Sequence, residues 1–399
     1  MTRRDGVPKV VVIGAGVAGS VVAARLASRC HVVVLERGGA GAPHHHPALA
    51  MRDPSQFLAT PYPQGIGLGG GSRVNGLVFE QPPAEYWTSL VARGLDVFSG
   101  VHDELARFDV EASAADGEVD RALLAAHPRA RPAALATRHG KRITAWERLT
   151  PRGVTLRTGV SVSHLRMRGD RALAVVAESG DEIAADHVVL CAGAIPSATI
   201  AVRSRLIAAT TRLLDHPGLF VPLGTGEPAA ETFVGALALV TGVMFMSVNG
   251  GHGGERGVLV GLMSPHSTGT VHVGYDSVSI ERGLLTDDTD RDTFRDALRE
   301  AATLLSHPVF APFVRPSVAL DDERWMDRVG EGMWHAAGTM SMGATADSTL
   351  DESGRLRGTT NVWCMDASVF PEIPPVPPQA AVMSTASLLA RRMLSLSTS

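Results

Sequence analysis

The chain has 399 residues, carries 37 basic and 41 acidic side chains for a formal charge of −4, and is 45% apolar. This composition excludes a disordered chain and allows one large globular domain or two interleaved ones. A near-neutral charge without a basic run argues against nucleic acid as a partner.

The cysteines and the apolar runs indicate the compartment. Cys30, Cys191 and Cys364 are widely spaced, which favours buried free thiols in a reducing environment. Arg3 and Arg4 are not followed by an apolar export segment, and no apolar run approaches the roughly eighteen residues of a membrane span. We therefore expect a soluble, cytoplasmic protein with no transmembrane segment.

The first forty residues predict a strand, a helix and a second strand. Residues 9–13 form a continuous apolar run, typical of a strand buried on both faces, and residues 31–35 form another. Between them, Val17, Val21 and Val22 recur at helical spacing. This is the βαβ opening of an α/β fold.

Three glycines lie between the first strand and the helix. Gly14 permits a tight turn, Gly16 lets the backbone approach a pyrophosphate, and Gly19 allows close helix–strand packing. Glu36 ends the second strand, where a carboxylate can bind ribose hydroxyls and would repel the 2′-phosphate of NADP. The pattern predicts a dinucleotide site but does not separate FAD from NAD.

The rest of the chain alternates between helical and strand patterns. A run too glycine-rich for a regular element stands at 65–71. Helices are expected at 84–126, at 288–306 and, after a stiff proline-rich lead-in, at about 380–394. Strands are expected across 154–190, with turns near 168–170 and 179–181, and the apolar run 187–198 indicates a buried strand that meets a tight turn. Apolar runs with glycine turns across 219–280 predict an antiparallel sheet in a second domain.

Seven segments, in order along nearly the whole chain, resemble the motifs of one enzyme family. The segment Leu68–Gly76, LGGGSRVNG, is similar to the flavin-binding signature LGGSSxxNG of the glucose–methanol–choline (GMC) oxidoreductases. The other matching segments are Pro83–Trp87, Val188–Ser197, Asp215–Pro217, Gly269–Val271 with Asp287–Asp290, His335–Gly343 and Asp366–Pro371. The chain is therefore identified as a shortened GMC member, with a faint similarity to the mycofactocin-associated subgroup.

The resemblance implies an FAD-binding, Rossmann-like α/β domain interleaved with a smaller α+β substrate domain that contains the antiparallel sheet. We expect the FAD-binding domain at 8–82, 137–217 and 335–395, and the substrate domain at 83–136 and 218–334. By the same resemblance, the FAD site is lined by Gly14, Gly16, Gly19, Glu36, Gly70, Ser72, Asn75, Val162, Asp366 and Ala367, with Val162 near the adenine.

His335 matches the active-site histidine of the family. An imidazole that titrates near neutrality can take the hydroxyl proton of an alcohol as its carbon gives up hydride. A histidine taken alone is more often a satisfied core residue, and only the surrounding motif favours catalysis here. Gln379 matches the position of a second polar residue. It can hydrogen-bond a substrate oxygen but cannot act as a base, and capping the C-terminal helix is an equal alternative.

Two further expectations concern covalent attachment of FAD and metal binding, and both are negative. Some family members attach FAD through a histidine where this chain has Val74, so we expect FAD to be held non-covalently. No metal site is expected, because His44, His45 and His46 are consecutive on one short loop and cannot easily converge on one ion.

The resulting hypothesis is an FAD-dependent dehydrogenase or oxidase acting on the CH–OH group of a small-molecule alcohol. Hydride passes to flavin N5 with His335 as base, and the electrons leave to an unidentified acceptor, which is oxygen or a mycofactocin-type carrier. A degenerate FAD-binding protein without turnover stays open, because of Gln379 and a missing insertion between Gly76 and Ile143. An NAD-dependent dehydrogenase would leave the glycine-rich run without a role.

Overall fold

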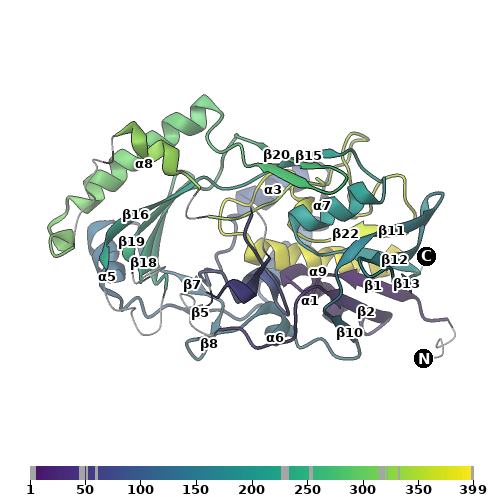
Figure 1. The fold of residues 1–399 in the computed structure, drawn as a ribbon. Helices are drawn as coiled ribbons and strands as arrows, with labels where there is room; N and C mark the ends of the chain where they lie inside the picture. The colour runs from purple at the N-terminus through teal and green to yellow at the C-terminus, as the bar shows by residue number, and fades with distance from the viewer. Residues whose placement is uncertain are drawn as a thin grey trace.

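The computed structural model describes residues 6–44, 50, 53–58, 62–225, 233–250, 255–313, 320, 322–330 and 333–396. Its elements form two lobes (Figure 1). One lobe is built on a parallel sheet with helices around it, and the other on an antiparallel sheet with α5 and α8 beside it. In the described part of the chain, no helix is long and apolar enough to cross a membrane.

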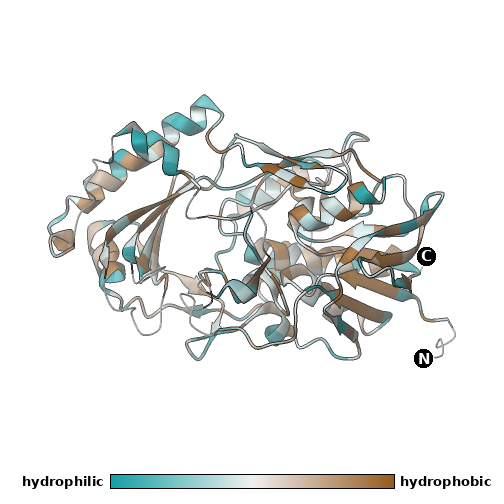
Figure 2. Cartoon of the chain, viewed as in Figure 1, coloured by the Kyte–Doolittle hydropathy of each residue, from teal (hydrophilic) through white to brown (hydrophobic). Residues whose placement is uncertain are grey.

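The parallel sheet confirms the βαβ opening. Its five strands lie in the order β10 (Thr155–Thr158), β2 (His31–Glu36), β1 (Lys9–Ile13), β14 (His187–Leu190) and β22 (Val362–Cys364). Val11 of the central strand pairs with Val33 on one side and Val188 on the other. Because both faces of this sheet are covered, the central strands can be apolar at nearly every position, and Figure 2 shows them as hydrophobic.

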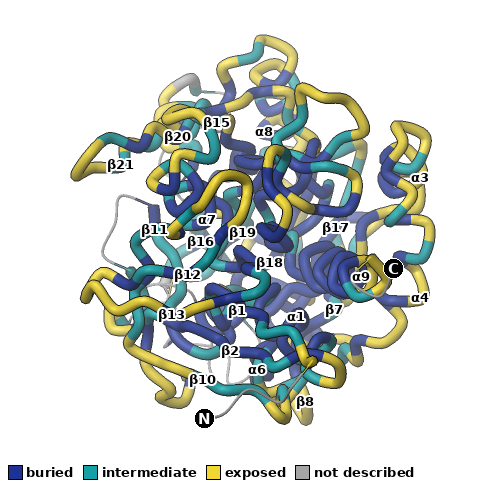
Figure 3. Tube along the Cα trace, turned by 90° about the vertical axis from the view of Figure 1, so that its right-hand side faces the viewer, coloured by how far each residue is buried: buried dark blue, intermediate teal, exposed yellow. Residues whose placement is uncertain are grey.

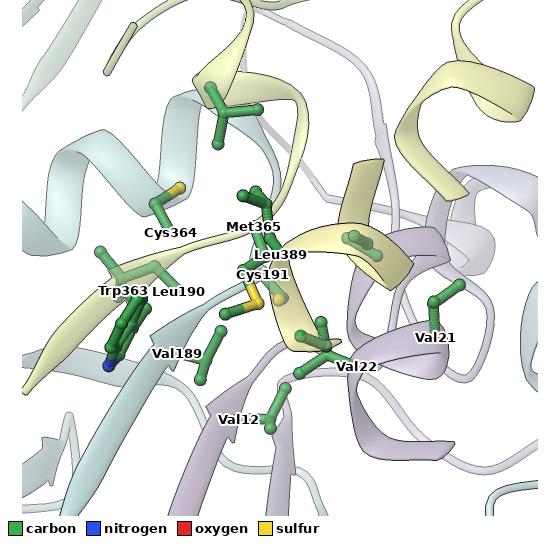
Figure 4. Close-up of a cluster of buried hydrophobic side chains, with 14 of the residues drawn as sticks. Val12, Val21, Val22, Val189, Leu190, Cys191, Trp363, Cys364, Met365 and Leu389 are labelled. Atoms are coloured by element: carbon green, nitrogen blue, oxygen red, sulfur yellow. The ribbon is translucent and has the colours of Figure 1, made fainter. Parts of the chain in front are cut away.

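Two helices, α1 (Val17–Leu26) and α9 (Gln379–Leu396), pack against each other beside the sheet. Figure 4 shows their apolar side chains, Val22 and Leu389, in one cluster with Val12 and Val189 of the strands. The helix predicted near 380–394 is thus confirmed, and Figure 3 shows α9 as the most continuously buried helix of the view. Cys30, Cys191 and Cys364 are buried free thiols, as expected.

A small antiparallel sheet and a helix complete this lobe. The strands β11 (Val162–Arg168), β12 (Arg171–Ala177) and β13 (Glu182–Ala184) are joined by the two turns that the sequence predicts. The helix α7 (Ala194–Arg203) packs against β11.

The second lobe contains the predicted antiparallel sheet. Its strands lie in the order β16 (Gly218–Thr225), β19 (Glu255–Leu262), β18 (Val243–Asn249), β17 (Ala236–Val240) and β6 (Arg131–Pro132). On one face, side chains such as Val243 and Phe245 pack on α5 (Glu118–Ala126) and α8 (Asp288–Leu305). The alternate side chains, Met244 and Met246, lie on the opposite face.

That opposite face joins the second lobe to the first. Met244 and Met246 share a buried cluster with Leu77, which follows the glycine-rich signature, and with Val376, which precedes α9. The two lobes are therefore held together by an apolar contact next to the segments that carry predicted site residues.

The remaining elements are short. A three-stranded sheet contains β15 (Thr210–Leu213), β20 (Gly269–Val273) and β21 (Val278–Glu281). The strand pairs are β3 (Phe57–Leu58) with β4 (Gln64–Gly65), β5 (Glu111–Ala112) with β7 (Ala134–Leu135), and β8 (Thr137–Arg138) with β9 (Lys141–Arg142). The other α-helices are α3 (Ala84–Ala92), α4 (Val101–Leu105) and α6 (Ala145–Leu149). The 3₁₀ turns are η1 (Pro54–Gln56), η2 (Gly70–Arg73), η3 (Asp96–Gly100), η5 (Pro308–Phe310), η6 (Glu323–Arg328) and η7 (Ala367–Val369).

The largely helical pattern expected over 84–126 is only partly right. The segment forms three separate helices, a 3₁₀ turn and the short strand β5. Gly94 adopts a φ of +86°, a left-handed conformation that ends the first helix, and Gly100 and Gly117 stand at the N-caps of the next two. By contrast, the helix expected at 288–306 forms as α8.

A buried carboxylate ties three helices together, and its removal should destabilise the fold. Glu104 of α4 accepts hydrogen bonds from Arg25 of α1 and from Ser387 and Arg391 of α9. We expect Glu104→Ala to lower the free energy of unfolding by about 2 kcal/mol, discounted because the arginines are partly exposed. Urea denaturation would measure this. The neighbouring exposed Asp103→Ala serves as the control, and equal midpoints for the two variants would contradict the assignment.

Candidate active site

The turn between β1 and α1 requires glycine at two positions, Gly14 and Gly19. Gly14 has a φ of +101°, and a Cβ there would lie 2.4 Å from the carbonyl oxygen of Cys191. A Cβ on Gly19 would lie 1.9 Å from the carbonyl oxygen of Gly14. Gly16, the N-cap of α1, has no side chain to bond the first amide groups of the helix. These amides and the positive end of the helix therefore offer an anion site.

The glycine-rich segment lies directly against this turn. The amide of Gly69 donates to the carbonyl of Ala15 at 2.8 Å. Gly70 has a φ of +50°, and a Cβ on it would lie 2.8 Å from the Cα of Gly16. The close approach of Gly70 and Gly16 makes a backbone-lined cradle at the carboxyl end of β1, where ligands of α/β folds bind.

Glu36 and Ser72 hold the walls of the cradle. The Glu36 carboxylate, at the end of β2, accepts the amides of Ala15, Gly38 and Gly67 at 2.8–3.0 Å. The Ser72 hydroxyl donates to the carbonyl of Gly69 and accepts the amide of Ala145. Both side chains thus fix protein backbone, and a contact of either with FAD stays a prediction.

Asn75 and Gln379 meet at the start of α9. The Asn75 Nδ2 donates to Gln379 Oε1 at 2.6 Å. The Gln379 Nε2 is buried and has no hydrogen-bond partner among the described residues. An orphaned buried donor of this kind is costly unless a ligand accepts from it.

Arg142 of β9 is a site residue that sequence reasoning missed. It donates to the Asn75 side chain at 2.9 Å, to the Asn75 carbonyl at 2.7 Å and to the Ser72 carbonyl at 2.6 Å. Burial lowers its pKa to about 9, and the nearby Arg73 acts in the same direction. No local signal could have revealed it, because it lies 67 residues after Asn75 and belongs to none of the matching segments.

Asp366 lies at the carboxyl end of β22, the edge strand of the parallel sheet. It follows β22, and its carboxylate accepts the Gly193 amide at 2.8 Å and the Ser197 hydroxyl at 2.5 Å. The carbonyl of Ala367 accepts the amide of Gly338 at 3.0 Å, which brings this segment to the one that begins at His335. Val162 is buried at the start of β11 and pairs with Ala177.

His335 lies beside a second histidine. The segments that carry them form a bridge between Leu214 and Ala337, with both backbone hydrogen bonds at 2.9 Å. The Nδ1 atoms of His216 and His335 are 2.8 Å apart, and the two rings are perpendicular. Among the described residues, no hydrogen bond joins His335 to Gln379, so their facing each other across a substrate stays a prediction.

A buried ion pair, Asp215 with Arg282, lies next to the two histidines. Asp215 accepts from Arg282 Nε at 2.7 Å and from the Tyr62 hydroxyl at 2.9 Å. The Arg282 guanidinium also stacks 4.3 Å from the ring centre of Trp334. Burial lowers the pKa of His335 to about 4, and the positive charge of Arg282 adds to this. His335 is therefore a neutral imidazole at neutral pH.

The described residues contain one group with metal-ligand geometry. His266, Asp287 and Asp290 place ligand atoms within 4.8 Å of one another. Asp287 accepts the amides of Thr289 and Asp290 at the start of α8, and Asp290 accepts the amide of Ser267, which accounts for their position without an ion. Of the three consecutive histidines, His45 and His46 lie outside the described residues, and His44 contacts Asp53 at 2.9 Å.

Comparisons with known proteins find similarity to oxidoreductases. A family model described as GMC oxidoreductase matches residues 265–386, and one described as pyridine nucleotide-disulphide oxidoreductase matches residues 112–212. The oxygen-dependent choline dehydrogenase of Vibrio vulnificus is 35% identical over 138 residues, which are 31% of this chain and 24% of that protein.

In sequence, the chain is similar to GMC oxidoreductases. The pyridoxine 4-oxidase of Microbacterium luteolum is similar over 94% of this chain and 97% of its own length, at 23% identity. Its solved counterpart from Mesorbium loti superposes with a TM-score of 0.85 at 22% identity, covering 97% of this chain and 99% of that one. A formate oxidase from Aspergillus oryzae RIB40 gives a TM-score of 0.84 at 16% identity, over 99% and 100% of the two chains. These two solved structures confirm the α/β fold.

The first three curated GMC relatives match only in part: the aligned regions span 24%, 54% and 25% of their lengths. The two family matches indicate a flavoprotein whose cofactor is FAD. The residues present fit this group, since the Gly16–Gly70 cradle and the uncapped amides of α1 can hold a diphosphate.

Adding one methyl group to the cradle should prevent FAD binding. In Gly70→Ala the new Cβ would meet Gly16 at 2.8 Å from a strained positive φ, so we expect purified protein with little flavin absorbance and FAD affinity at least about tenfold weaker. Gly71→Ala is the matched control, because its Cβ would meet nothing within 4 Å and the GMC signature has serine there. Equal flavin content in the two variants would sink the assignment of the cradle.

Proposed function

We propose that this GMC oxidoreductase oxidises the CH–OH group of an alcohol, with His335 as the base and FAD held non-covalently. The observation that carries the proposal is the neutral His335 imidazole, whose Nδ1 is hydrogen-bonded to His216. Burial lowers the pKa of this imidazole to about 4. A neutral imidazole has a lone pair with which to accept a proton, as a base needs.

Each polar group has one task in this proposal. Bound FAD supplies the acceptor for the hydride. His335 takes the hydroxyl proton at Nε2, the nitrogen that does not contact His216. Gln379 donates from its unpartnered Nε2 to the substrate oxygen, and Asn75 holds the other end of its amide. Val74 has no side-chain atom that could bond to the flavin, which supports non-covalent binding.

The substrate wall is proposed to be the apolar face of the second lobe. Met244, Met246, Met263 and Met333 belong to the buried cluster beside Leu77. Methionine adapts its shape to what it contacts, so this wall suits an uncharged alcohol without strict shape selection. We propose that the two lobes correspond to the FAD-binding and substrate domains, except that α3 and α4, expected in the substrate domain, pack in the core of the first lobe.

The names of the relatives favour alcohol substrates in general. One curated relative is a choline dehydrogenase and another a pyridoxine oxidase. The electron acceptor, oxygen or a mycofactocin-type carrier, stays a prediction.

The first test is anaerobic reduction of the flavin by a panel of alcohols. We expect one or more alcohols to bleach the visible flavin bands, and His335→Ala to bleach about 10²–10⁴ times more slowly with unchanged flavin content. Stopped-flow absorbance measures the rate, and His272→Ala, at an exposed histidine of β20, is the control. Flavin bands that no alcohol bleaches would support the degenerate FAD-binding alternative.

The reaction should also resist mild acid. Because burial lowers the pKa of His335 from 6.5 to about 4, the base stays unprotonated until the pH approaches that value. We expect the bleaching rate constant at saturating alcohol to be level from roughly pH 8 to roughly pH 5.5 and to fall as the pH passes through about 4. A rate that already halves near pH 6.5 would contradict a buried, neutral base.

A further inference from the structure

One carboxylate sets the backbone of both histidines. Asp215 Oδ1 accepts the amide of His216 at 2.9 Å and the amide of His335 at 2.8 Å. The adjacent bridge between Leu214 and Ala337 fixes the same two segments. The contact between the two rings is therefore a product of a rigid local frame.

The contact between the rings allows only two arrangements. Two Nδ1 atoms at 2.8 Å share one proton, so one ring donates and the other accepts. If His335 donates, its Nε2 carries a lone pair. If His216 donates, the Nε2 of a neutral His335 carries the proton and cannot act as a base.

The surroundings of His216 favour the first arrangement. The ring is fully buried, and the carbonyl groups of Met263 and Pro374 are close enough to favour a proton on it. The Nε2 atom of His216 makes no hydrogen bond of ordinary geometry with a described residue. Because the Nδ1 atom of His216 faces His335, Nε2 is nevertheless the nitrogen that carries the single proton of the His216 ring. Burial and the neighbouring His335 keep the pKa of His216 well below its usual range, so the ring holds one proton only.

We propose that His216 is a positioning residue that accepts the Nδ1 proton of His335 and so leaves the His335 Nε2 lone pair for the substrate. The inference rests on the function proposed above. In the reaction the alcohol O–H bond breaks and its proton joins His335 Nε2, the oxygen electron pair forms the C=O bond of the product, and the C–H pair leaves as hydride, for which bound FAD would be the acceptor. The His335 imidazolium then donates more strongly to His216, which stays neutral and gains no proton.

Two variants test whether His216 acts as a hydrogen-bond acceptor for His335 or only fills space in the core. His216→Leu removes the acceptor, and His216→Asn keeps one, because an amide oxygen can take the place of Nδ1. We expect His216→Leu to slow flavin bleaching about 10–100-fold with little change in the Kd for the alcohol, and His216→Asn to restore most of the rate. His102→Leu, at an exposed histidine of α4, is the control.

A second measurement reads the tautomer without turnover. Two-bond ¹H–¹⁵N spectra of the ¹⁵N-histidine-labelled holoenzyme distinguish protonated from unprotonated ring nitrogens, and the signals missing in His335→Ala identify His335. We expect an unprotonated Nε2 in the wild type, and a mixture of tautomers or a protonated Nε2 in His216→Leu.

The outcomes distinguish the inference from the function on which it rests. A protonated His335 Nε2 in the wild type, or equal rates for His216→Leu and wild type, overturns the inference alone. Equal losses in the leucine and asparagine variants with unchanged tautomers would assign His216 a purely structural role. If no alcohol bleaches the wild type, the proposed function fails, and the spectra still decide the tautomer.

Discussion

A buried carboxylate holds together the parts of the site that carry charge. Asp215 binds the Tyr62 hydroxyl, the Arg282 guanidinium and the amides of two histidine-bearing segments. These groups come from stretches of chain far apart in the sequence, and each alone would be costly to bury. Burial raises the pKa of Asp215, and Arg282 offsets this. The carboxylate and its partners are thus stable only as a set.

Arg282 has opposite effects on its two neighbours. It stabilises the negative charge of Asp215, and it disfavours a positive charge on His335. A base with a low pKa accepts a proton only while the reaction drives the transfer, and it releases that proton readily afterwards. The ion pair of Asp215 and Arg282 therefore orders the backbone of the site and also keeps the His335 imidazole neutral between turnovers.

Features fixed by local sequence could be predicted, and those made by long-range contacts could not. The turn at Gly14 and the strand ending at Glu36 depend on neighbours within about twenty residues, so their pattern is visible in the chain. The bonds of Arg142 to Asn75 and of Arg282 to Asp215 each join residues 67 apart, and no periodicity marks them. The helical pattern over 84–126 misled because glycines interrupt an otherwise favourable composition.

The order of the parallel sheet has a consequence for biosynthesis. Its neighbouring strands β14 and β22 begin at His187 and Val362, and α9, which packs on α1, comes later still. A chain growing on the ribosome thus has an open sheet edge beside β14 and an uncovered apolar face on α1 until β22 and α9 have emerged. Such long-range closure is slow and prone to aggregation. Slower growth at low temperature during expression should therefore raise the yield of native protein.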